Sequence, residues 1–192
     1  MKQSMALLPL IFILVSCNDL TGTFLVEKEF KLKNTYTQDE DSIVSKDYGE
    51  VKVKPLFRGR SMRLALTRSD AYDFNIPKNA IPENGEFQIT SAQSGQDVLL
   101  SGAVKTERVR TEIENAYVDC TYLRVEKVCT PQGCFDTSVS VYGKKWERRY
   151  FERTNQWLNM SILSNNAQDK LAKFSGDVSF TQKIVLSDGM CR

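Results

Sequence analysis

The sequence predicts an all-β antiparallel fold, either a two-sheet β-sandwich or an up-and-down β-barrel, with about nine or ten short strands and one short helix near the C-terminus. Apolar and polar residues alternate in runs of the length that half-buried strands have. Glycine, proline and asparagine separate these runs at short intervals. Strand-like runs do not alternate with helix-like runs, so a parallel sheet is not expected.

The N-terminal segment, residues 1–16, has the pattern of a secretory signal peptide. Lys2 precedes an apolar run, Met5–Val15, which is too short to cross a hydrocarbon core of about 30 Å as a helix. Residues 14–17 read Leu-Val-Ser-Cys, which resembles the lipobox of bacterial lipoproteins. The resemblance implies cleavage directly before Cys17, a diacylglycerol on its thiol and a third acyl chain, such as palmitate, on its new amine.

A lipid on Cys17 implies a membrane-tethered protein of the bacterial cell envelope. Removing the first 16 of the 192 residues leaves 176, a usual size for one domain, so residues 17–192 are expected to form a single all-β domain. Two or more acyl chains hold such a domain at a bilayer almost permanently. Asn18 rather than aspartate follows the cysteine, which by analogy with Gram-negative lipoproteins favours the outer membrane over the inner one.

The mature chain contains a series of predicted strands joined by turns. Residues 50–57 and 62–66 form a predicted hairpin. A turn is predicted at Gly143, which separates two of the later strands. The other predicted strands cover residues 23–33, 86–90, 97–113, 117–129, 135–142, 145–153, 157–163 and 178–186.

One helix is predicted, over residues 166–174. Asn166 can cap its first turn, and Ala167, Leu171 and Phe174 follow at helical spacing. Gly176 comes just after the last of these residues and is a common residue at the end of a helix.

Four cysteines remain once Cys17 carries lipid, and export favours disulfides over free thiols. Cys129 and Cys134 flank the turn-forming sequence Thr-Pro-Gln-Gly, so we expect them to pair. Cys120 then pairs with Cys191 by elimination. Four thiolate ligands for zinc are usually two close pairs, and this spacing lacks them. We therefore expect two disulfides and no metal site.

Composition argues against several functions. The chain has no histidine, which removes Ser-His-Asp triads, Cys-His pairs and histidine-based metal sites. A net charge of +2 gives no indication of a nucleic-acid partner. Glu107, Glu112 and Glu114 are candidate carboxylates for glycoside hydrolysis, but nothing in their spacing places two of them in one cleft. The sequence predicts a protein that is not an enzyme and needs no cofactor.

One stretch combines aromatic and basic residues at strand spacing. Tyr142, Trp146 and Tyr150 would share a strand face with Lys144 and Arg148. Such a ladder can stack on sugar rings and hold anionic groups. Alternatively, the aromatic rings pack inside the fold and the stems of the cations cover them.

Three binding functions follow from these observations. An interaction module that docks on another envelope protein would leave an apolar or aromatic patch exposed. A carrier of a small apolar ligand would enclose an apolar cavity, and residues 20–24 are similar to the opening of bacterial lipocalins, with Phe24 in place of the usual tryptophan. A binder of cell-wall glycan or peptidoglycan would use the aromatic and basic residues of the ladder.

Overall fold

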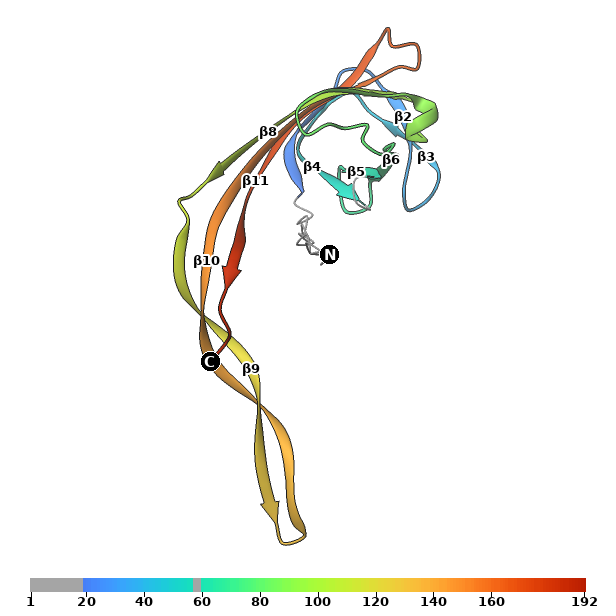
Figure 1. The fold of residues 1–192 in the computed structure, drawn as a ribbon. Coiled ribbons are helices and arrows are strands. Elements are labelled where there is room, and N and C mark those ends of the chain that lie inside the picture. The colour runs from blue at the N-terminus through green and yellow to red at the C-terminus, as the bar shows by residue number, and fades with distance from the viewer. Residues whose placement is uncertain (1–18, 57–59) are drawn as a thin grey trace, which may run out of the picture. The chain divides into compact units, whose positions relative to one another are not determined.

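The computed structural model describes residues 19–56 and 60–192. Cys17 and the predicted leader lie outside these residues. No helix within the described ranges is long and apolar enough to cross a membrane. The regular elements among the described residues are one short helix, α1 (Ser91–Ser94), and strands, so the all-β prediction is confirmed (Figure 1). The strands are β1 (Leu20–Val26), β2 (Phe30–Lys33), β3 (Glu40–Ile43), β4 (Asp47–Leu56), β5 (Ser61–Ala65), β6 (Ala71–Asn75), β7 (Gly85–Ile89), β8 (Leu99–Arg110), β9 (Glu114–Thr130), β10 (Gly133–Leu163) and β11 (Lys170–Asp188).

The chain divides into two compact units. Unit 1 comprises the described residues through Val104 together with Leu158–Val178, and unit 2 comprises Lys105–Trp157 and Ser179–Arg192. Strands β8, β10 and β11 contribute residues to both units. The expectation of one domain over residues 17–192 stays a prediction.

Unit 1 is an antiparallel sheet that curls around a core. The strand order is β6-β5-β4-β1-β11-β10-β8-β7, and the predicted hairpin is present as β4 and β5. Strands β2 and β3 form a separate two-stranded sheet. The Gln96 side chain, in the connection after β7, donates to the Asp73 carbonyl of β6 at 2.9 Å and to the Lys33 carbonyl of β2 at 3.1 Å. Gln96 therefore links the β7 end of the sheet to its β6 edge.

The core of unit 1 is built from inward-facing residues of these strands. Phe24 on β1 lies directly opposite Phe174 on β11, and their exposed fractions are 0% and 1%. Phe74, Leu64 and Ile89 are also fully buried. Burying a large apolar side chain contributes about 1.5–3 kcal/mol, so these residues supply much of the stability of the unit.

The helix predicted over residues 166–174 is wrong. Ala167 has a φ of 57°, in the left-handed region, so the chain turns there, and β11 begins at Lys170. Ala172 and Phe174 are both buried, which is the two-residue alternation of a strand. The segment forms a strand rather than a helix because pairing with β1 buries these two residues in the core. The short helix of the structure, α1, instead follows β7.

Candidate functional site

The predicted aromatic and basic residues all lie on β10 in unit 2. Here β10 pairs antiparallel with β9, from Arg149 opposite Glu114 to Gly133 opposite Thr130, and the two strands form a long twisted hairpin (Figure 1). Strand β10 runs without a break through residues 133–163. The turn predicted at Gly143 is therefore wrong, and residues 142–150 belong to one continuous strand.

Gly143 makes room for the C-terminal residues instead of bending the chain. A Cβ at this position would lie 2.4 Å from the carbonyl oxygen of Arg192 and 3.1 Å from the ring of Tyr122. The Lys144 N–H donates to the Arg192 carbonyl at 2.8 Å, and the Arg192 N–H donates back at 3.2 Å. The end of the chain thus runs beside β10 and is hydrogen-bonded to its backbone.

Both predicted disulfides are confirmed. Cys129 and Cys134 lie directly opposite each other in the hairpin, with their Cα atoms 4.0 Å apart. Cys120 pairs with Cys191 across a Cα separation of 5.9 Å. Because Cys120 lies opposite Gly143, this second bond ties the C-terminal segment to β9 across the glycine.

One face of the hairpin turns aromatic, aliphatic and basic side chains to solvent, and we call it the aromatic face. The exposed fraction is 88% for Tyr142, 79% for Tyr117 and 42% for Trp146. Tyr150 is half-buried, and the Arg110 guanidinium lies 5.5 Å from the centre of its ring. The aromatic face consists of Tyr142, Lys144, Trp146 and Arg148 on β10 and of Tyr117, Asp119, Thr121, Leu123 and Val125 on β9.

Tyr117 was missed by the sequence prediction, although a signal for it existed. Residues that face each other in a hairpin can be counted outward from a cross-strand disulfide. Tyr117 precedes Cys129 by as many residues as Trp146 follows Cys134, and the structure places the two aromatic residues opposite each other. The predicted disulfide thus fixed the register that brings them together.

The indole of Trp146 is held against the chain that follows β11. A Cβ at Gly189 would lie 2.6 Å from the indole Cδ1 and Nε1 atoms. The Gly189 N–H also donates to the Trp146 carbonyl at 2.9 Å. One side of the indole ring therefore packs against the backbone of Gly189. This contact fixes the orientation of the exposed part of the ring.

The cations of the aromatic face are Lys144 and Arg148, on β10. Lys144 and Arg148 are exposed, and neither forms an ion pair with any other residue among 19–56 and 60–192. Asp119 lies opposite Lys144 in the register, without an ion pair between them. Both cations are therefore available to donate charge-assisted hydrogen bonds to an anionic ligand.

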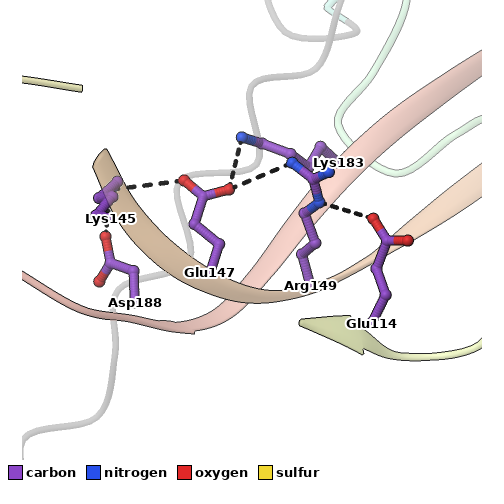
Figure 2. Close-up of polar contacts among 6 residues, drawn as sticks. All are labelled: Glu114, Lys145, Glu147, Arg149, Lys183 and Asp188. Carbon is purple, nitrogen blue, oxygen red and sulfur yellow. Dashed lines mark hydrogen bonds and ion pairs between the residues drawn. The ribbon is translucent and has the colours of Figure 1, made fainter. Parts of the chain in front are cut away.

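The opposite face of the hairpin carries a network of ion pairs (Figure 2). The Glu147 carboxylate is at its centre: it lies 2.9 Å from Lys183 Nζ, 3.5 Å from Lys145 Nζ and 3.7 Å from Arg149 Nη1. Only 4% of Glu147 is exposed, because its immediate neighbours cover it. The network is completed by ion pairs of Arg149 with Glu114 and of Lys145 with Asp188.

This network is balanced in charge. Its cations and carboxylates are equal in number, and each has a partner. The members come from β9, β10 and β11, so the network joins three strands on one side and leaves the aromatic face to solvent.

We expect the stability of unit 2 to depend on pH through Glu147. The hydrogen bond from Lys183, helped by the charge of Lys145, lowers the pKa of the Glu147 carboxyl, although desolvation acts in the opposite direction. The folded pKa is therefore below the unfolded value of about 4.3. The stabilisation is complete above that value and is lost as pH falls through the folded pKa.

The measurement compares Glu147→Gln with the wild type in denaturant unfolding at neutral pH and near pH 3. The variant should be less stable at neutral pH, and the difference should shrink in acid. Glu126→Gln is the control, because Glu126 pairs with Arg124 at the surface. A difference that is equal at both pH values would contradict the role given to the Glu147 charge.

The three glutamates considered as catalytic carboxylates are each paired with a cation or exposed to solvent. Glu107 pairs with Lys105 at 2.6 Å, and Glu114 pairs with Arg149 at 2.9 Å. Glu112 is exposed between β8 and β9. Within the described ranges, no group of three or more histidine, cysteine, aspartate or glutamate residues is placed to hold a metal ion.

No protein-family model, curated protein or solved structure matches this chain.

Proposed function

We propose that this protein is a non-catalytic binding module of the bacterial cell envelope, tethered to a membrane by a lipid on Cys17, with the aromatic face of the β9–β10 hairpin as its binding surface. The observation that carries the proposal is the exposure of Tyr117, Tyr142 and Trp146 beside two cations that form no ion pair with another described residue. A concentration of exposed aromatic rings is typical of interaction sites. The ion pairs that stabilise the hairpin lie on its other face and leave this one free.

The chemistry of the aromatic face suits an anionic glycan such as peptidoglycan. Tyr142 and Trp146 are four residues apart on one strand, which spaces their rings by about 13 Å. Flat aromatic rings pack against the apolar faces of sugars, and Lys144 and Arg148 can bind carboxylate groups between them. A polymer can lie along the ribbon and contact each ring in turn.

The proposed lipid tether is inferred from the sequence of the leader, which lies outside the described residues. Full-length protein extracted from membranes with detergent is the material that tests it. The expected intact mass is that of a chain that begins at Cys17 and carries two or three acyl groups. The outer membrane is the proposed location, because Asn18 follows the lipidated residue.

Binding to peptidoglycan should depend on the aromatic face. We expect Tyr142→Ala combined with Trp146→Ala to reduce the amount of detergent-solubilised protein that sediments with purified peptidoglycan by about tenfold, because two stacking contacts are lost. Phe135→Ala is the matched control, because Phe135 is exposed on the opposite face of the same hairpin. Equal sedimentation of the double variant and the wild type would contradict the proposal.

Docking on another envelope protein is the second candidate function. Leu123 and Val125 extend the aromatic face toward the hairpin tip, with exposed fractions of 73% and 65%. Aliphatic side chains suit a protein surface better than a glycan. If Leu123→Ser abolishes the capture of an envelope protein but leaves peptidoglycan binding intact, protein docking and glycan binding are separate functions of the aromatic face.

The carrier function has less support. Large side chains such as Phe24, Phe74 and Phe174 fill the interior of unit 1. A hollow of about 710 Å³ in this unit is lined by charged and polar residues such as Glu86 and Lys173 together with apolar ones such as Phe87, whereas a carrier of apolar ligands needs an apolar enclosure.

A further inference from the structure

Strand β9 has a long backbone edge without a partner in the part of the chain that the structure describes. Its 17 residues pair with β10 on one side only. Such an edge is a template for another strand, and proteins often protect it with proline or a bulge. Strand β9 contains no proline and pairs with β10 in an unbroken register.

Hydrogen bonds on β10 show which backbone groups of β9 point outward. Lys144 exchanges hydrogen bonds with the C-terminal segment, on the side of β10 away from β9. The backbone N–H and C=O groups of β10 that point toward β9 therefore belong to Gly143 and Lys145. These two residues lie opposite Cys120 and Val118 of β9, whose backbone groups point toward β10. Backbone groups of successive strand residues point to opposite sides, so the residues of β9 that alternate with Val118 and Cys120 direct their N–H and C=O groups to the open edge. They include Tyr117, Asp119, Thr121, Leu123, Val125 and Lys127.

The charges along β9 complement a second copy of the same strand in one register. Two antiparallel copies related by a two-fold axis at Leu123 place Asp119 opposite Lys127 of the second copy, and this pair occurs twice. Tyr122 then faces Arg124, which brings a cation to an aromatic ring. Neither Asp119 nor Lys127 has an ion pair among the described residues, so both gain a partner.

Neighbouring registers lack this match. An axis at Arg124 would place the two copies of that arginine directly opposite each other, which is repulsive. An axis at Tyr122 would place Asp119 opposite Val125. An axis at Val125 would pair Arg124 with Glu126, which are already paired within the strand.

We propose that β9 pairs with β9 of a second copy, antiparallel and with Leu123 on the two-fold axis, to form a homodimer. The axis is perpendicular to the sheet, so the aromatic faces of both copies lie on the same side and become continuous. The pairing needs neither lipid nor ligand. It therefore goes beyond the proposed function, and a monomeric protein would leave that function untouched.

The first test is disulfide cross-linking of the detergent-solubilised full chain. Opposed residues at the axis have Cα atoms about 5.5 Å apart, within the range of a disulfide. Leu123→Cys should therefore form a covalent dimer under mild oxidation. Val125→Cys is the matched control, because it lies on the same face but opposite Thr121 of the second copy. Equal cross-linking of both variants, or none by Leu123→Cys, would overturn the register.

The second test is a charge reversal followed by sedimentation velocity. Asp119→Lys and Lys127→Asp should each weaken dimerisation by about tenfold, and the double variant should restore it. Within one chain these residues face Lys144 and Asp136, so the double variant leaves like charges opposed there. Rescue must therefore come from contacts between chains.

Intact masses should show two disulfides in every charge variant, as in the wild type. A wild type that remains monomeric at its highest soluble concentration, or a double variant that is not rescued, would overturn the proposal.

Discussion

Replacing Phe174 with alanine should destabilise unit 1 by about 3–5 kcal/mol. Phe174 is fully buried on β11 opposite Phe24 on β1, in the middle of the core. Truncation removes the transfer free energy of the ring and leaves a cavity in the core beside two strands that are fixed by their hydrogen bonds. The sheet cannot close this cavity without moving both strands.

Hydrogen exchange of the β1 amides measures this effect, since those amides report opening of unit 1. Lys173→Ala is the control, because Lys173 is the outward-facing neighbour on the same strand. A change of less than about 1 kcal/mol in Phe174→Ala would mean that this position is not the close-packed core described here.

Removing the disulfide between Cys120 and Cys191 should cost roughly 4 kcal/mol, and removing the one between Cys129 and Cys134 roughly 2 kcal/mol. The two bonds close loops of very different length, with sequence separations of 71 and 5. A longer loop has more conformational entropy in the unfolded chain, so closing it gives the larger stabilisation.

Paired serine variants compare the two bonds in denaturant unfolding. The variant lacking Cys120 and Cys191 should also lose hydrogen-exchange protection at Lys144 and Gly189, because the C-terminal segment is then free to separate from β10. The variant lacking Cys129 and Cys134 should keep this protection. The reverse order of stabilities would contradict the loop-length argument.

The sequence was sufficient for features that depend on local alternation or on cysteine spacing. Period-two alternation predicted the all-β fold and the β4–β5 hairpin. The turn between Cys129 and Cys134 predicted one disulfide and left a single pairing for the other two cysteines. The residues predicted for the ladder lie on one strand, and four of them are exposed on one face.

Features that depend on distant partners could not be predicted in this way. Residues 166–174 have helical spacing, but pairing of β11 with β1 overrides it. Gly143 was predicted to form a turn. The glycine instead leaves space for Arg192, and this contact with the far end of the chain cannot be seen in the local sequence. The segment predicted as one strand over residues 23–33 divides into β1 and β2, because the N–H groups of Glu27 and Lys28 both donate to the Leu171 carbonyl.

The ion-pair network also escaped prediction. Glu147 and Lys183 are 36 positions apart in the sequence, and nothing in their local surroundings connects them. Their contact requires that β11 lie beside β10, which only the sheet order provides.

The most direct test of the proposed binding surface is ¹⁵N NMR of the tryptophan indole N–H groups during titration with soluble peptidoglycan fragments. The chain has two tryptophans, Trp146 on the aromatic face and Trp157, whose ring lies 5.4 Å from Lys105 Nζ. We predict that the Trp146 indole signal shifts in proportion to bound fragment while the Trp157 signal stays in place. An unchanged Trp146 signal, or equal shifts of both signals, would contradict the assignment of the aromatic face as the glycan-binding surface.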